Sequence, residues 1–288
     1  TVGGRGPSKK RPDTRSGQVL GGRYRIERQL AKGGMGRVYL ATQIPLERPV
    51  AIKVLNPDFQ KTDPQFVRRF CLEASISARL SHPNVITIHD YGEAENGDLF
   101  MAMEFLDGHP LSRVIARHAP FPPERVAHIA IQICRGLREA HGRGVIHRDL
   151  KPGNVMIVTS GEDPDFVKVL DFGLVKLFQR EGEMEGFGHL DPEGGADGAP
   201  ELTRAGTLLG SPRYMSPEQI RGDDLDPRTD IYSLGIILYQ MAAGRAPFSG
   251  KTSVDVIYKH MNHEVPPLTG MDCPPPLESI IMKCLEKN

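Results

Sequence analysis

Residues 147–154, which read His-Arg-Asp-Leu-Lys-Pro-Gly-Asn, constrain this chain more than any other segment. A run rich in β-branched and apolar residues follows at 155–158, and a second such run at 167–170 leads into Asp171. The pattern predicts a short polar loop and then two strands, the second of which delivers Asp171. Two acids and one amide therefore lie at fixed offsets around a single loop.

The polar side chains of this segment are those that phosphoryl transfer requires. Asp149 is the candidate base, which accepts a hydrogen bond from an attacking hydroxyl and orients it. Lys151 would neutralise charge on the transferring phosphate. Asn154 and Asp171 carry hard oxygen donors of the kind that hold Mg²⁺, with waters and phosphates completing the octahedron.

Together with Asp171-Phe172-Gly173, this segment closely matches the catalytic-loop and metal-loop motifs of protein kinases. Over roughly residues 20–288 the chain resembles the eukaryotic-type (Hanks-type) serine/threonine protein kinases, and the residues around the motifs resemble those of the bacterial branch. The alternative, that these residues are ordinary solvent-exposed polar side chains, does not explain six matches at the family's spacing.

The resemblance implies an α+β, two-lobed protein-kinase fold. It has a small antiparallel-sheet N-lobe with one main helix at about 20–104 and a mostly helical C-lobe at about 107–288. ATP would bind between the lobes and donate its γ-phosphoryl group to Ser or Thr hydroxyls of protein substrates. The expected metal is Mg²⁺, with Mn²⁺ as a substitute, and Lys151 favours Ser/Thr over Tyr acceptors.

A glycine-rich hairpin is expected near the start of the domain. Tyr24, Ile26 and Leu30 alternate with polar residues, and the alternation resumes after a turn at residues 31–36. Such a turn is weak evidence by itself, because backbone freedom explains it. Its place between two strands disfavours a dinucleotide-binding or Walker loop. The resemblance implies a loop that folds over nucleotide phosphates, although Ala31 replaces the family's first glycine.

The resemblance also implies a nucleotide site made of this hairpin, the next strand and a hinge. Met103 would guard the back of the adenine pocket, although core packing is the commoner use of Met. The residues expected to contact the nucleotide are Leu30, Ala31, Lys32, Gly33, Gly34, Met35, Gly36, Val38, Ala51, Lys53, Met103, Glu104 and Leu106.

A lysine and a glutamate are expected to pair beside the nucleotide. Residues 49–55 alternate as a strand in which Lys53 points away from the apolar face. In the next helix, between residues 64 and 80, Glu73 lies on the apolar stripe, where an unpaired carboxylate would be costly. Either residue alone is weak evidence. The resemblance implies that Lys53 holds phosphates while paired with Glu73.

Three further expectations concern the C-lobe. A buried stripe predicts a helix over residues 123–141. His147 is expected to pack and to bond backbone groups, not to act as a base. Asp230 opens an apolar helix that ends near Gly244. It is either a helix N-cap or, as the resemblance implies, an acceptor for backbone groups of the catalytic loop.

The segment that follows the metal loop is expected to control activity. An acidic, Gly-rich insertion at about 178–202 predicts a solvated, disordered loop, and a sharper alternative is that it competes for basic groups near the active site. Thr203 and Thr207 are candidate autophosphorylation sites, with Arg148 as the phosphate clamp. Ser211 matches the family's acceptor-cradling position. A transient homodimer would serve trans-autophosphorylation.

Expectations for the two ends come from composition and from the resemblance. Residues 1–19 are basic and lack an apolar period, which predicts a disordered arm. The C-terminal end, at residue 288, reads as a truncated kinase domain. We expect this domain to be cytoplasmic and the full-length protein to be membrane-anchored through parts outside this sequence.

Composition argues against several other functions. The formal net charge is 0, so no global field attracts nucleic acid. The longest apolar stretch, residues 231–243, is too short and too polar to span a bilayer. Four cysteines are scattered without a Cys-x-x-Cys pair, which argues against zinc and disulfide frameworks and suits a reducing cytosol.

Two rival functions remain open at this point. A pseudokinase would act as a binding module, but such proteins usually lack Lys53, Asp149 or Asp171, all of which are present. A small-molecule kinase would share the ATP machinery. Lys151 and residues 210–218, which match a polypeptide-holding segment, disfavour it.

Overall fold

The computed structural model describes residues 15–59, 65–172 and 212–287. The chain divides into two compact units. Unit 1 comprises Thr1–Val67 and Ile88–Phe105, and unit 2 comprises Arg68–Thr87 and Leu106–Asn288. The predicted insertion at about 178–202, together with Thr203, Thr207 and Ser211, lies outside the described residues.

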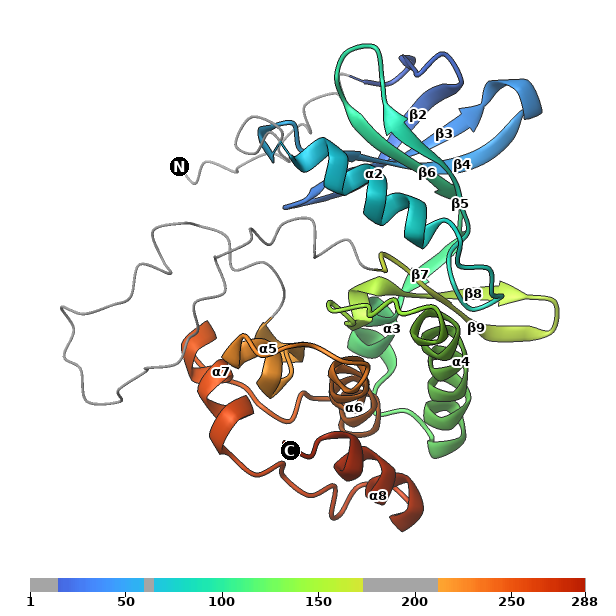
Figure 1. Ribbon diagram of the computed structural model, residues 1–288. Helices are drawn as coiled ribbons and strands as arrows, with labels where there is room; N and C mark the ends of the chain where they lie inside the picture. Colours follow the sequence, from blue (N-terminus) through green and yellow to red (C-terminus); the bar gives the residue numbers. More distant parts are fainter. Residues whose placement is uncertain (1–14, 60–64, 173–211, 288) are drawn as a thin grey trace, which may run out of the picture. The chain divides into compact units, whose positions relative to one another are not determined.

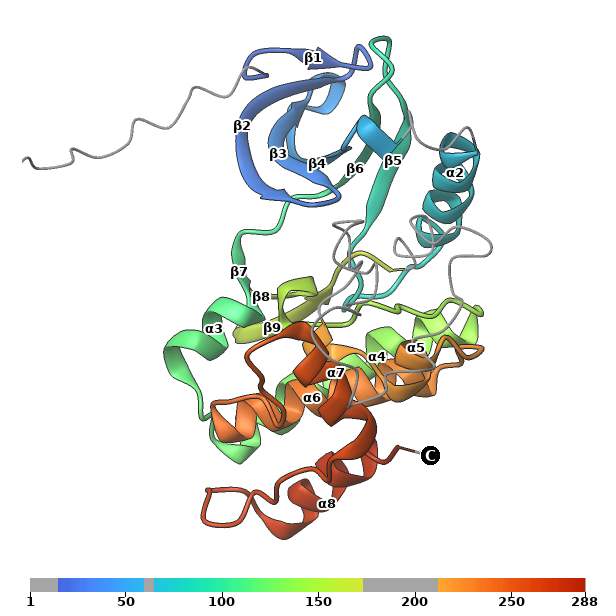
Figure 2. The same ribbon diagram turned by 90° about the vertical axis from the view of Figure 1, so that its left-hand side faces the viewer.

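Unit 1 is built on a six-stranded sheet with the order β1-β2-β3-β4-β6-β5, in which every pair is antiparallel. The sheet is strongly curled, and its strands wrap around a common interior (Figure 2). A short 3-10 helix, η1 (Ile44–Leu46), joins the third and fourth strands. The strands are β1 (Val19–Leu20), β2 (Tyr24–Gly33), β3 (Gly36–Gln43), β4 (Arg48–Leu55), β5 (Ile88–Glu93) and β6 (Leu99–Glu104).

The alternation predicted for residues 49–55 is confirmed in β4. Val50, Ile52 and Val54 belong to the apolar cluster inside the curled sheet, together with Tyr39 and Phe100. Because successive side chains of a strand point to opposite faces, Ala51 and Lys53 lie on the other face. This second face is the one to which the sequence assigns the nucleotide.

The predicted alternation of side chains in β2 holds for Tyr24 and Ile26 but is wrong for Leu30. Tyr24 and Ile26 are buried at 1% and 2% exposure, but Leu30 is 37% exposed. The pairing register with β3 shifts between Ile26 and Arg28 and again between Gln29 and Ala31. Each shift changes which face of the sheet the following side chains of β2 point to. A prediction based on strict two-residue alternation does not include such shifts.

The turn of this hairpin is also tighter than predicted. Gly33 pairs with Gly36, so the connection consists of Gly34 and Met35 alone, and not of residues 31–36. Ala31 pairs with Val38 as an ordinary member of the ladder. Its methyl group therefore needs no special backbone conformation, which explains how the chain accommodates Ala31.

Residues 15–19 are ordered against the sheet, which corrects this part of the predicted disordered arm. The Arg15 guanidinium forms an ion pair with Asp98, a carboxylate that is only 8% exposed. The amide of Asn96 donates to the same carboxylate at 2.7 Å. Backbone bonds join Gly17 and Gln18 to Ile26, at 2.8 Å each. Residues 15–19 are therefore anchored by the buried carboxylate of Asp98, which is distant in the sequence.

Unit 2 holds most of the helices and a three-stranded sheet with the order β7-β8-β9 (Figure 1). The strands are β7 (Gly108–Pro110), β8 (Val155–Ser160) and β9 (Asp163–Val169), and the 3-10 helices are η2 (Pro152–Asn154) and η5 (Pro212–Tyr214). The α-helices are α2 (Phe66–Ser77), whose first residues belong to unit 1, α3 (Leu111–His118), α4 (Pro123–Gly142), α5 (Pro217–Arg221), α6 (Arg228–Ala243), α7 (Ser253–Asn262) and α8 (Pro275–Cys284).

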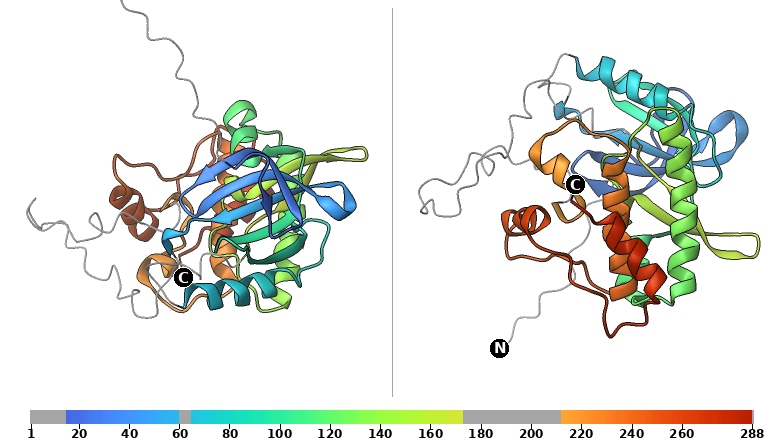
Figure 3. Two further views of the ribbon diagram at one scale, coloured as in Figure 1. Left: turned by 90° about the horizontal axis from the view of Figure 1, so that it is seen from above. Right: turned by 60° about the horizontal axis from the view of Figure 1, so that its bottom comes forward.

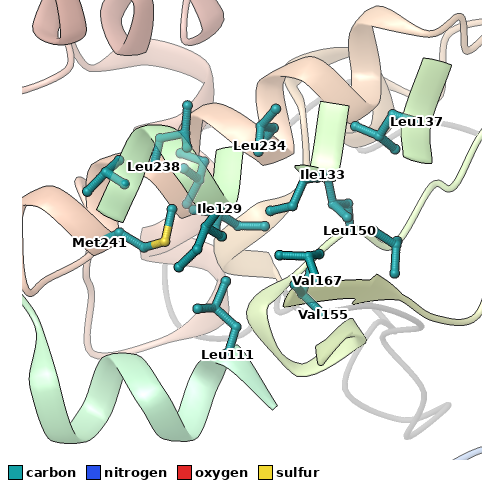
Figure 4. Close-up of a cluster of buried hydrophobic side chains, with 14 of the residues drawn as sticks. Leu111, Ile129, Ile133, Leu137, Leu150, Val155, Val167, Leu234, Leu238 and Met241 are labelled. Carbon is teal, nitrogen blue, oxygen red and sulfur yellow. The ribbon is translucent and has the colours of Figure 1, made fainter. Parts of the chain in front are cut away.

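The core of unit 2 forms where α4 meets α6. The helix predicted for 123–141 is confirmed, and its stripe of Val126, Ile129, Ile133, Leu137 and Ala140 is buried at 1% exposure or less. In Figure 4 Ile129, Ile133 and Leu137 of this stripe lie among apolar side chains of α6 and of the β8–β9 sheet.

Helix α6 runs beside α4 and also packs on α8 (Figure 3). It is apolar nearly all round, because neighbours cover it on several sides. The approach of α8 is close: a Cβ added at Gly235 would lie 2.8 Å from Cys284 Cβ. Among the described residues, no helix has the length and apolar character needed to cross a membrane.

Strand β9 is fixed by a buried amide pair. The Asn84 side chain, which is buried, donates to Gln132 Oε1 at 3.1 Å and to the Val167 carbonyl at 2.9 Å. Gln132 Oε1 also accepts from Val167 N at 2.9 Å, and Val169 N donates to the Asn84 carbonyl at 2.8 Å. These bonds tie the loop after α2 to α4 and set the position at which β9 ends.

We predict that Gly36→Ala destabilises unit 1, whereas Gly34→Ala does not. The φ angle at Gly36 is +155°, and a Cβ there would lie 2.1 Å from the Val54 carbonyl oxygen. Gly34 has no atom within 4 Å of its built Cβ. We expect a loss of about 1–3 kcal/mol for Gly36→Ala and a change within about 0.5 kcal/mol for Gly34→Ala. Urea denaturation followed by circular dichroism measures both, and equal stability of the two variants would contradict the prediction.

Candidate active site

A single buried carboxylate anchors residues 147–148. Asp230 lies near the start of α6 and is fully buried. Its Oδ2 accepts from His147 N at 2.8 Å, and its Oδ1 accepts from Arg148 N at 3.0 Å. His141 Nε2, in the last turns of α4, lies 2.7 Å from the same Oδ2. The N-cap alternative is wrong, because Pro227 occupies that position, and the backbone-acceptor alternative is confirmed.

His147 packs and bonds backbone groups, as expected. Its Nδ1 accepts from Asp149 N at 3.3 Å. The ring proton is therefore on Nε2, which donates to the Leu170 carbonyl at 2.8 Å. The fully buried ring also packs on Phe172, with centroids 4.8 Å apart. This side chain thus joins residues 147–149 to the end of β9.

Asp149, Lys151 and Asn154 converge on one point. Lys151 Nζ lies 2.5 Å from Asp149 Oδ2. Asn154 Nδ2 donates to the Asp149 carbonyl at 2.8 Å and to its Oδ2 at 3.2 Å. The Asp149 side chain retains 10% exposure, so solvent reaches it. The structure thus presents a partly open carboxylate that a cation and an amide hold in place.

Asp171 is placed beside this cluster by the backbone. Leu170 N donates to the Asn154 carbonyl at 2.8 Å, which joins the end of β9 to η2. The φ angle of Asp171 is +59° and that of Arg148 is +66°. Positive φ is unfavourable for residues with a Cβ, so surrounding contacts must impose it. On the far side, Ser77 Oγ holds the Phe172 carbonyl at 2.9 Å.

The sequence analysis missed Gln219 and His141. Gln219 Nε2 donates to the Arg148 carbonyl at 2.7 Å, while its Oε1 accepts from Ser216 N at 3.0 Å. The spacing Ser216-x-x-Gln219 is a capping-box signal, but it predicts only a helix start. No sequence signal indicates that the same amide, or the His141 imidazole, would support residues 147–148.

In unit 1 the predicted nucleotide residues fall on β2, β3, β4 and β6, and Gly34 and Met35 form the turn between β2 and β3. Val38 pairs with Lys53, which in turn pairs with Met101, and Ala51 pairs with Met103. Directly paired residues share a face, so these side chains form one continuous patch. Glu104 ends β6, and Leu106 follows it as the first residue of that part of unit 2.

Lys53 and Glu73 belong to different units. Lys53 is buried on β4 at 7% exposure. Glu73 is half-buried on α2, on the stripe where Phe66, Phe70 and Ser77 are buried. The stripe is therefore confirmed, and the ion pair stays a prediction.

Comparison of this chain with known proteins points to the same family as the arrangement of the site. The sequence pattern that defines the protein kinase domain matches residues 24–288. The chain belongs to the protein kinase domain family. The predicted family and its α+β fold are therefore confirmed.

Two curated relatives of this kinase domain carry the name serine/threonine-protein kinase. Pkn3 of Myxococcus xanthus is 42% identical over 283 residues, covering 96% of this chain and 49% of that protein. PknA of Mycobacterium tuberculosis is 38% identical over 278 residues, covering 95% of this chain and 59% of that protein. The chain thus spans about half to three fifths of the length of these relatives.

The kinase fold is also seen in a solved structure. The crystal structure of the Mycobacterium tuberculosis PknI kinase domain matches this chain with a TM-score of 0.67 and 27% sequence identity. The match covers 95% of this chain and 90% of that one.

We predict that Asp230→Asn destabilises the kinase domain by about 2–4 kcal/mol. The substitution keeps the side-chain shape but turns one acceptor oxygen into an amino group, which faces buried N–H donors and leaves one without a partner. Asp226→Asn is the matched control, because Asp226 is exposed and pairs with exposed Arg228 at 2.6 Å. Urea unfolding monitored by fluorescence or circular dichroism reports both. Similar midpoints for the two variants would show that the Asp230 contacts contribute little.

Proposed function

We propose that this chain is a serine/threonine protein kinase domain, which transfers the γ-phosphoryl group of ATP to Ser and Thr hydroxyls of proteins. The observation that carries the proposal is the convergence of Asp149, Lys151 and Asn154 beside Asp171 in unit 2. Family membership makes the same reaction the expected one, because protein kinases use ATP and a divalent metal ion.

In this proposal Asp149 is the group that handles the acceptor proton. The acceptor hydroxyl donates to the carboxylate, its oxygen forms a bond to the γ-phosphorus, and the bond to the β–γ bridging oxygen breaks. The proton passes to Asp149 as the new bond forms. Lys151, 2.5 Å from the same carboxylate, would neutralise charge on the transferring group. Such catalysis depends on position and electrostatics, which the anchored loop supplies.

Asn154 and Asp171 have the donor atoms that a magnesium ion requires. The amide nitrogen of Asn154 is committed to Asp149, which leaves its Oδ1 as the metal donor. The bond from Leu170 N to the Asn154 carbonyl holds the backbone just before Asp171 against Asn154, and we expect the Asp171 carboxylate to meet the same metal ion. Mg²⁺ prefers a few carboxylate or carbonyl oxygens and retains waters and phosphates, and Mn²⁺ accepts the same ligands. We propose Mg²⁺ as the usual ion and Mn²⁺ as a substitute.

We further propose that unit 1 supplies the nucleotide contacts. The patch of Val38, Ala51, Lys53 and Met103 offers apolar surface with one buried cation. Lys53 would hold phosphates and pair with Glu73, and the backbone of Glu104 and Leu106 would meet the adenine edge. The lobe boundaries at about 20–104 and 107–288 belong to the same proposal.

Regulation by phosphorylation is part of the proposal. Arg148 is held in place by Asp230 and Gln219, and a guanidinium so placed can clamp a phosphate. Thr203 and Thr207 remain the proposed autophosphorylation sites, with Ser211 near the acceptor. A transient homodimer would allow one copy to modify another. All four cysteines are free thiols, in keeping with the proposed reducing, cytoplasmic setting.

We predict that Asp149→Asn lowers the phosphotransfer rate by a factor of about 10²–10⁴, because the amide cannot accept the hydroxyl proton. The assay uses radiolabelled ATP with Mg²⁺ and a generic basic protein acceptor. Asp223→Asn is the matched control, since the Asp223 side chain is exposed and pairs with the exposed Arg221. The control should keep the native rate.

Unchanged transfer in Asp149→Asn would contradict the assigned role, and no transfer by the native chain would favour the pseudokinase alternative. A peptide library tested against free sugars and amino alcohols separates a protein kinase from a small-molecule kinase. Gel electrophoresis of the radiolabelled reaction separates the acceptor from the kinase chain. Label on the kinase chain itself then reports autophosphorylation.

A further inference from the structure

His260 of α7 is a buried imidazole that the proposed mechanism does not use. It is fully buried, and its Nδ1 lies 2.9 Å from the hydroxyl of Tyr232 on α6. The ring also meets Phe248 edge-on, with centroids 4.9 Å apart. A polar ring in such a place needs its hydrogen bonds, because burying an unpaired polar group is costly.

The protonation state of this ring follows from its surroundings. Burial, with a smaller contribution from the charge of Lys287, lowers the pKa of His260 to about 4, while the backbone of Arg213 acts in the opposite direction. Burial and the charge of Glu218 raise the pKa of Tyr232, so its hydroxyl stays a donor. With Nδ1 accepting from Tyr232, the proton of the neutral ring is on Nε2.

Nε2 is the ring nitrogen left for a contact with η5 (Pro212–Tyr214), because Nδ1 is bonded to Tyr232. The backbone of Arg213, in η5, is close enough to favour a charge on His260, and η5 packs against α7. Among the described residues, Nε2 has no hydrogen-bond partner of good geometry. The buried Nε2–H is therefore a donor whose candidate acceptor is the backbone carbonyl of Arg213.

The same segment is held from α6. Ser233 Oγ donates to the Tyr214 carbonyl at 2.7 Å, and the Tyr214 hydroxyl donates to Gln240 Oε1 at 2.8 Å. Residues 212–214 thus bond to α6 and pack against α7, the helix that carries His260. The resemblance to protein kinases implies that residues 210–218 hold the polypeptide acceptor.

Helix α7 is itself held at its C-terminal end. Lys287 Nζ donates to the carbonyls of Lys259 and His263, and it lies 5.0 Å over the ring of Phe248. A cation at this end of a helix is favourable because the carbonyls there carry partial negative charge. His260 therefore projects from a fixed support.

We propose that His260 is a positioning residue for the polypeptide acceptor, acting through Tyr232 and the backbone of Arg213. It would hold residues 212–214 in the conformation that receives the acceptor chain. The inference rests on the proposed kinase function and adds to it one residue that governs acceptor binding. It concerns the acceptor alone, since ATP is assigned to other parts of the chain.

The test is steady-state kinetics of the 288-residue chain with a peptide acceptor and ATP. Tyr232→Phe removes only the hydroxyl that bonds His260, and His260→Phe removes both ring nitrogens. Each should raise the KM for the peptide about three- to tenfold, the effect of one lost hydrogen bond, with the KM for ATP within about twofold of native. His260→Asn, whose Oδ1 can replace Nδ1 as the acceptor from Tyr232, should recover the part of the loss that the Tyr232 bond contributes.

Tyr239→Phe is the matched control. Tyr239 is also a fully buried tyrosine of α6, but in the described part of the chain its hydroxyl has no hydrogen-bond partner. Its loss should leave both KM values unchanged. If His260→Phe does not fold, Tyr232→Phe still decides, because it removes a single oxygen.

A native KM for the peptide in folded Tyr232→Phe would overturn the inference and leave the kinase function standing. An equal rise in both KM values would overturn it as well, since a general loss of structure would explain that result. A native chain that phosphorylates no acceptor would overturn the proposed function together with the inference.

Discussion

The Asp230 carboxylate is the interaction on which the rest of the site depends. It is fully buried, and it accepts from two consecutive backbone N–H groups and faces an imidazole nitrogen. A buried charge is tolerated only when donors surround it. In return, two consecutive amides are fixed in direction, which places Arg148 at its unfavourable φ of +66°. This strain next to Asp149 persists because the surrounding contacts impose it.

Hydrogen bonds connect the residues held by Asp230 to the other parts of the site. The His147 side chain bonds the Leu170 carbonyl at the end of β9, and Leu170 N in turn bonds the Asn154 carbonyl of the loop. The Asn84–Gln132 amide pair fixes β9 from the other side. Asp149 and Asn154 belong to one segment and Asp171 to another, but all three share one support. That support is the apolar packing of α6 on α4, which keeps water away from Asp230.

Local sequence patterns predict the elements of this fold well where one face is buried. The alternation in β4 and the stripe of α4 are examples, since each depends on a single period and a single core. The prediction fails in β2, where two register shifts turn Leu30 away from the core. It also fails at residues 15–19, because the partner of Arg15 is Asp98, and no local pattern shows such a distant pair.

The polar support of the site was also beyond local patterns. Asp149, Lys151, Asn154 and Asp171 could be named from their motif spacing. His141, Gln219 and His260 could not, because their partners are backbone atoms or side chains distant in sequence. A helix stripe shows that a residue is buried, but it does not show which buried donor the residue will meet.

Amide hydrogen exchange at residues 147 and 148 tests the central claim most directly. If the Asp230 carboxylate holds these N–H groups, His147 and Arg148 should exchange as slowly as the amide of Ile133 in the middle of α4, since both would need unfolding of unit 2. Exchange of His147 and Arg148 at the rate of an unprotected surface loop would contradict the account. In that case the loop would open on its own, and Asp230 would not be its anchor.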